Sequence, residues 1–110
     1  MARYLITDAS GFVGSNLIRK LIDENQELTI LIREDSDLWR INDLVPKIQT
    51  FKTDLSNYGK LEKIISDIDP DFVYHLGTYG GYPFQTSIQK ITQVNILNTI
   101  NLFESLSKCN

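Results

Sequence analysis

A glycine-bearing turn over residues 8–14 has the residue types and spacing of a phosphate site. Gly11 and Gly14 follow the apolar run 4–6 and precede a stretch with helical periodicity. Such a turn leaves backbone N–H groups free at a helix N-terminus, where they can hold a phosphate. Gly11 permits close approach of the backbone to a pyrophosphate, and Gly14 permits the helix to pack on the strand. The spacing predicts a dinucleotide site, and a turn whose glycines serve packing alone is the alternative.

Asp8 departs from this pattern, because a glycine is expected at the first position of such a turn. Aspartate adopts left-handed backbone more readily than most residues, so the turn can still form. Its carboxylate would lie near the pyrophosphate, and two like charges about 4 Å apart repel by roughly 1 to 4 kcal/mol. We therefore expect Asp8 to weaken cofactor binding. Ser10 can donate its hydroxyl to the phosphate, cap the helix, or do both. The residues expected at the pyrophosphate are Asp8, Ser10, Gly11, Phe12, Val13 and Gly14.

Arg33 is a second candidate, since it directly follows the apolar run 28–32. An NAD site commonly carries a carboxylate here for the ribose hydroxyls, whereas an arginine accommodates a 2′-phosphate. A guanidinium also pairs bidentately with phosphate and stacks on adenine. Arg33 therefore favours NADP over NAD. The neighbouring Glu34 and Asp35 leave the ribose acceptor open, and a solvated surface arginine is the alternative reading.

Alternating strands and helices must position these residues. Apolar runs of strand type cover 4–6, 28–32 and 71–76, and the alternating segment 48–53 also suits a strand. Helical spacing predicts helices around 17–22, over 37–44 (stopped by Pro46), around 61–68 (stopped by Pro70) and over 87–108, with loops at 33–36 and 77–83. This alternation implies parallel strands with right-handed crossovers. We expect an α/β, three-layer Rossmann-like fold of about four parallel strands in the order 3-2-1-4, with helices on both faces. The ligand crevice would open between the first and fourth strands.

Four segments carry a family resemblance: 7–17, 53–55, 73–77 and 95–104. With them the chain resembles the N-terminal part of an extended short-chain dehydrogenase/reductase, of the NAD-dependent epimerase/dehydratase type that acts on nucleotide sugars. The resemblance implies that residues 1–110 are a single NAD(P)-binding Rossmann domain, truncated from a longer enzyme that transfers hydride at a sugar carbon. The catalytic and substrate-binding parts would lie outside this chain.

The resemblance also assigns roles to residues that follow the third and fourth strands. Asp54 matches the position whose carboxylate receives the adenine amino group, and Leu55 would flank the ring; helix capping by Asp54 is the alternative. Gly77, Thr78 and Tyr79 would lie beside the nicotinamide ribose, with aromatic packing as the alternative for Tyr79. The resemblance treats two further polar residues as structural, namely His75 and Asn95, the latter as a buried tie between helix and sheet.

No catalytic residue is expected in this chain. The family chemistry uses a Tyr-x-x-x-Lys pair, and no tyrosine here has a lysine four residues later. Without that pair there is no phenol whose pKa a nearby ammonium lowers for proton transfer. Residues 1–110 alone should therefore be inactive. A non-catalytic NADP-sensing or regulatory module, or a Rossmann-like domain that has lost its cofactor, as Asp8 favours, remain alternative functions.

Composition narrows the set of partners. The net charge of −3 argues against nucleic acid and anionic membranes as partners, and no apolar run is long enough to span a bilayer. The single cysteine excludes an internal disulfide and offers no metal cluster, so a cytoplasmic setting is expected. The partner in the parent enzyme would be a nucleotide sugar. The apolar strand 71–76 would form an open sheet edge, which predicts a homodimer through that edge.

Overall fold

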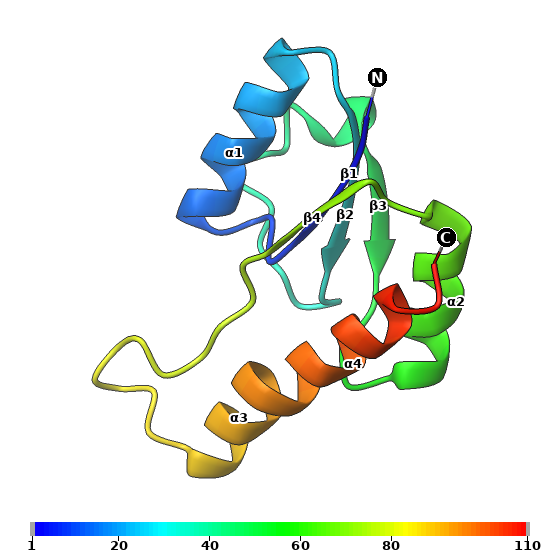
Figure 1. Cartoon of the computed structure of the whole chain (residues 1–110). Helices are drawn as coiled ribbons and strands as arrows, with labels where there is room; N and C mark the ends of the chain where they lie inside the picture. Colours follow the sequence, from blue (N-terminus) through cyan, green and yellow to red (C-terminus); the bar gives the residue numbers. More distant parts are fainter. Residues whose placement is uncertain (1, 110) are drawn as a thin grey trace.

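The computed structural model describes residues 2–109 and contains one parallel sheet with helices on both faces (Figure 1). Its strands are β1 (Arg3–Thr7), β2 (Glu27–Ile32), β3 (Gln49–Lys52) and β4 (Phe72–His75). The strands lie in the order β3-β2-β1-β4, and all neighbouring pairs are parallel. The expected strand order and the Rossmann-like α/β architecture are therefore confirmed.

The helices form two layers around the sheet. One face carries α1 (Phe12–Asp23), and the other carries α2 (Tyr58–Ile68) and α4 (Asn98–Leu106), as Figure 1 shows. A short helix α3 (Ile88–Thr92) is joined to α4 by a π-helical turn, η2 (Gln93–Leu97). A 3-10 turn, η1 (Val45–Lys47), precedes β3.

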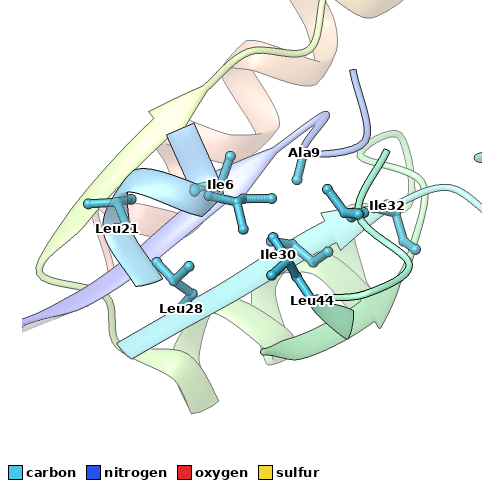
Figure 2. Close-up of a cluster of buried hydrophobic side chains, with 9 residues drawn as sticks. Ile6, Ala9, Leu21, Leu28, Ile30, Ile32 and Leu44 are labelled. Carbon is cyan, nitrogen blue, oxygen red and sulfur yellow. The ribbon is translucent and has the colours of Figure 1, made fainter. Parts of the chain in front are cut away.

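Alternating side chains of the central strands divide the core in two. Ile6 and Ile30 lie on the α1 side, where they pack with Leu21 and Leu44 (Figure 2). The intervening strand residues face α2 and α4, with Leu5 buried among the apolar residues of those helices. Full burial of each such aliphatic side chain contributes about 1.5–3 kcal/mol. The two-residue period of the strands thus fixes the sheet between two apolar layers.

The expected helix over 37–44 is wrong. This stretch consists of consecutive turns, with Leu44 N–H donating to the Ile41 carbonyl at 2.8 Å, three residues back instead of four. Three Asp and Asn residues within the stretch favour turns over helix because their side chains compete for backbone groups. Pro46 does not stop a helix; it lies in the first turn of η1, where a missing N–H costs little.

The expected long helix over 87–108 is present as α3, η2 and α4 in succession. Ser87 caps its start, since its hydroxyl oxygen accepts from the Lys90 N–H at 3.2 Å. The π-helical turn interrupts the regular α geometry over Gln93–Leu97, a feature that periodicity could not predict. Such turns recur at functional sites.

Strand β4 forms one edge of the sheet and pairs only with β1 in the part of the chain that is described. Phe72 and Tyr74 on this strand keep 53% and 41% of their surface exposed. Tyr4 on β1 stacks on both rings, with centroids 5.0 Å from Phe72 and 6.1 Å from Tyr74. No helix within residues 2–109 has the length and hydropathy needed to cross a membrane.

Candidate functional site

A cleft of about 350 Å³ opens at the carboxyl ends of the strands. Its walls come from the segments that follow β1, β2, β3 and β4, and from one face of α3 and η2. Residues far apart in the sequence, from Asp8 to Asn98, therefore meet in one place. This is the edge at which ligands bind in open α/β sheets.

The turn after β1 has the backbone of a phosphate site. Asp8 adopts a left-handed conformation with φ 53°, and the Gly11 N–H donates to the Asp8 carbonyl at 3.4 Å. Helix α1 starts with Gly11 as its N-cap, and no side chain within residues 2–109 caps it. Ser10 therefore does not cap the helix, which corrects one of the two roles considered for it. The first amides of α1 lack a side-chain partner, as an anion site at a helix N-terminus requires.

The two glycines of this turn differ in what they do for the fold. A Cβ atom at Gly14 would lie only 2.8 Å from the Ala9 Cα and the Asp8 carbonyl oxygen, so glycine is needed for α1 to pack on the turn. Gly11 has extended backbone, and a Cβ there would make ordinary contacts at 3.6 and 3.7 Å with Asp8. The packing of the fold therefore does not require glycine at position 11.

The Asp8 carboxylate lies in the cleft wall. Desolvation by the surrounding protein raises the pKa of Asp8 above its ordinary value, while the positive charge of Arg33 and the nearby His75 lower it in part. Asp8 is exposed and lines the cleft. Asp8 thus contributes a carboxylate to the lining of the cleft.

His75 holds the end of β4 through a chain of hydrogen bonds. The Thr7 Oγ1 accepts from the Leu76 and Gly77 N–H groups at 2.9 and 3.3 Å, so its own proton must go to His75 Nδ1 at 2.7 Å. His75 Nε2–H then donates to the Thr99 hydroxyl at 3.0 Å. Both ring nitrogens are used with the imidazole neutral, and burial lowers the pKa of His75. This is a structural role.

Asn95, within η2, fixes the loop after β4 at the cleft. Its Oδ1 accepts from the Tyr79 N–H at 2.9 Å and from the Thr78 hydroxyl at 3.2 Å. Its Nδ2 donates to the Tyr79 carbonyl at 2.6 Å. Asn95 is half-buried and links the helix to this loop. A buried link between the helix and the sheet was expected instead. The arrangement positions Gly77–Tyr79 along the cleft.

Asp54 and Arg33 lie at the other end of the cleft. The Asp54 Oδ1 accepts from the Ser56 N–H at 2.9 Å; that contact, the Ser56 hydroxyl and Arg33 lower the pKa of Asp54. Helix α2 is capped by Asn57 and not by Asp54, which rules out the alternative role for Asp54. Arg33 is exposed, and its Nε lies 3.8 Å from a carboxylate oxygen of Asp35.

The structure separates the expected site residues into two groups. The residues that line the cleft are Asp8, Arg33, Asp54, Leu55, Gly77, Thr78 and Tyr79. The remaining ones belong to the turn and the first turn of α1, outside the cleft wall: Ser10, Gly11, Phe12, Val13 and Gly14.

Sequence reasoning missed further residues of the cleft wall. They are Thr7, Leu31, Ile32, Ser36, Thr53, Ser56, Gln85, Lys90, Gln93, Val94 and Asn98. Lys90, Val94 and Asn98 recur at intervals of four and therefore share one helix face. That spacing was the available signal, but it becomes informative only once this face is known to cover the cleft.

Comparisons with known proteins agree with this architecture. Residues 4–110 match the model of the NAD dependent epimerase/dehydratase family. A dTDP-glucose 4,6-dehydratase of Haemophilus influenzae is 30% identical, over 94% of this chain and 32% of its own length. The UDP-Glc/GlcNAc 4-epimerase structure from Campylobacter jejuni superposes with a TM-score of 0.87 at 21% identity, covering 98% of this chain and 34% of that one.

A second solved structure, the Bordetella bronchiseptica enzyme WbmG in complex with NAD and UDP, superposes with a TM-score of 0.83 at 22% identity. That match covers 97% of this chain and 34% of WbmG. The chain spans about a third of the length of the relatives it matches. On the match of the family model to residues 4–110, this chain belongs to the NAD dependent epimerase/dehydratase family.

Proposed function

We propose that the cleft binds NAD(P) and that residues 1–110 form the cofactor-binding domain of a nucleotide-sugar epimerase, dehydratase or reductase. The observation that carries the proposal is the convergence of Asp54, Arg33 and the loop Gly77–Tyr79 on one cleft beside an uncapped helix N-terminus. The relatives named as epimerases and dehydratases, and WbmG solved with NAD, support the same cofactor and substrate classes.

Each part of the cleft has a role in this proposal. The first amides of α1 hold the pyrophosphate, and the ionised Asp54 receives the adenine amino group beside Leu55. Gly77–Tyr79, fixed by Asn95, border the nicotinamide ribose. When bound, the cofactor would accept or donate a hydride at a sugar carbon. The Tyr and Lys that move protons in the family are not in this chain, so residues 1–110 should show no turnover of nucleotide sugars by themselves.

We propose NADP as the preferred cofactor, with NAD as the competing choice. Arg33 is exposed at the cleft and can pair with a 2′-phosphate, which supports NADP. The NAD found with WbmG supports NAD. The affinity of either cofactor is lowered by Asp8.

NMR mapping tests the binding site. NAD or NADP added to labelled protein should shift the amide signals of residues 8–14, 54–55 and 77–79 more than those of α2. Saturable shifts confined to another surface, or no shift at millimolar cofactor, would contradict the proposal. The second outcome would favour a Rossmann-like domain that has lost its cofactor, for which the cleft-facing Asp8 carboxylate is the supporting observation.

We also propose that this chain associates with a second copy of itself, forming a homodimer through the open edge of β4. Within residues 2–109 this edge has backbone N–H and C=O groups without a neighbouring strand, beside the exposed rings of Phe72 and Tyr74. Sedimentation should show self-association of the protein. Val73→Pro, a substitution within β4, should weaken this association because proline cannot donate a backbone hydrogen bond along the strand. A monomer at high concentration would contradict this arrangement.

A further inference from the structure

Lys90 is the one lysine in the wall of the cleft, and neither the glycine turn nor the family resemblance pointed to it. It enters from α3, on the face that also carries Val94. A second hollow shares residues with the cleft and is lined by Lys90 together with Arg33, Glu34, Asp35 and Asp54. Lys90 therefore lines the cleft from the helix side, together with the segments that follow β2 and β3.

The Lys90 ammonium is held in place without being neutralised. Its Nζ lies 4.9 Å from the centroid of the Tyr79 ring, a cation–π contact, and Asn95 fixes the backbone of Tyr79. Within residues 2–109 no carboxylate lies within ion-pair distance of Lys90, whereas Lys20 and Lys108 each pair with a glutamate. Lys90 is exposed, so its charge is available to a ligand.

The balance of charges around the cleft indicates a role for Lys90 in binding an anionic ligand. The charged side chains that line the cleft are Asp8, Arg33, Asp54 and Lys90. Arg33 is already shared among carboxylates, since it acts on both Asp8 and Asp54 and lies 3.8 Å from Asp35. A dinucleotide brings at least two more negative charges into this space. Lys90 supplies a second cation to meet them, beside Arg33.

We propose that Lys90 binds a phosphate of the dinucleotide, either the pyrophosphate or the 2′-phosphate, and offsets the repulsion that Asp8 imposes. This inference rests on the proposed cofactor site and adds a residue to it. A lysine on a flexible stem suits this role, because it can leave the Tyr79 ring and follow the phosphate as the cofactor enters. The ammonium then exchanges a cation–π contact for a charge-assisted hydrogen bond, which is the stronger interaction.

Lys90→Gln, with Lys63→Gln as its matched control, tests the proposal. Lys63 is an exposed lysine on α2 that does not line the cleft. Each variant is titrated with NAD and with NADP by NMR, after thermal melts confirm an unchanged fold. Lys90→Gln should weaken binding about tenfold or more, as expected for one charge-assisted phosphate contact, and Lys63→Gln should match the wild type. Lys90→Arg should keep most of the affinity.

The two cofactors distinguish the phosphates. An equal loss for NAD and NADP assigns Lys90 to the pyrophosphate, and a loss for NADP alone assigns it to the 2′-phosphate. Unchanged affinity of Lys90→Gln for both cofactors would overturn the role of Lys90 and leave the proposed function intact. A wild-type protein that binds neither cofactor would overturn the proposed function itself, and the role of Lys90 with it.

Discussion

Replacement of Asp8 by asparagine should tighten binding of NAD and remove a pH dependence that the wild type shows. Asparagine keeps the size of the side chain and accepts the left-handed backbone at this position, φ 53°, so the fold should be preserved. The substitution removes the negative charge and replaces one acceptor oxygen by an NH₂ donor. Any change in affinity can then be assigned to the carboxylate.

The size of the effect follows from the geometry of the turn. A Cβ atom built on Gly11 lies 3.7 Å from Asp8 Oδ2, so a phosphate oxygen in the same space would be about equally close to that carboxylate. Two like charges at this distance repel by roughly 1 kcal/mol in water and 4 kcal/mol near a protein surface. Since 1.4 kcal/mol corresponds to a tenfold change, we expect Asp8→Asn to bind NAD at least about tenfold more tightly at neutral pH.

The sign of the pH dependence follows from the same charge. Desolvation raises the pKa of Asp8 in the free protein, and a bound pyrophosphate would raise it further. Protonated Asp8 is therefore favoured in the complex, and wild-type affinity should fall as the pH rises through the raised pKa of the free protein. Burial lowers the pKa of His75, the other titrating neighbour of Asp8.

Calorimetric titration with NAD at several pH values between about 4 and 8 measures this dependence. Asp67→Asn is the control, since Asp67 is an exposed carboxylate on α2 away from the cleft, and it should behave like the wild type. If Asp8→Asn binds NAD with the affinity and the pH profile of the wild type, the carboxylate does not face the cofactor and the electrostatic reasoning is refuted.

Four other substitutions probe the ribose end, the turn and the support of the cleft. Arg33→Ala should weaken NADP binding by about tenfold to a hundredfold more than NAD binding, as measured by titration. Equal losses of affinity for the two cofactors would show that Arg33 is a solvated surface residue that does not contact the 2′-phosphate. Gly14→Ala should lower the free energy of unfolding by about 1–3 kcal/mol in denaturant melts, because its Cβ would lie 2.8 Å from backbone atoms of the turn. Gly11→Ala should leave the free energy of unfolding unchanged and weaken cofactor binding. The free energy of unfolding should fall as the pH drops below about 6.5, because the unfolded chain takes up a proton at His75 before the folded protein does; a His75→Gln variant with the same pH profile would contradict this.

The order of the strands and the location of the cleft could be predicted because they depend on simple periodicities. Apolar runs such as Leu28–Ile32 alternate with helical spacings such as Leu61, Ile64, Ile65 and Ile68, and parallel crossovers have one hand. Residues that directly follow strands, Arg33 and Asp54 among them, then had to meet at one edge. Local sequence was sufficient for this part of the site.

Other features depend on tertiary context. The turns over 37–44 are stabilised by burial of Ile41 and Leu44 against the sheet, which a short stretch rich in Asp and Asn does not reveal. The π-helical turn at Gln93–Leu97 contains Asn95, which accepts a hydrogen bond from the Tyr79 N–H. Nothing in the local sequence of either segment predicts this tertiary contact. Lys90 could not be assigned for the same reason.

The most direct test of a dinucleotide site in this cleft is the dissociation constant of NAD for the wild type and Asp8→Gly, measured side by side by calorimetry. Removal of the carboxylate should leave one saturable site that binds at least about tenfold more tightly than the wild type, whose dissociation constant should lie in the range of tens of micromolar or weaker. The fold should be unchanged, since glycine adopts the left-handed backbone of position 8 freely. Failure of both proteins to bind NAD and NADP at millimolar concentration would contradict the account, and equally tight binding by both would show that Asp8 does not face the cofactor.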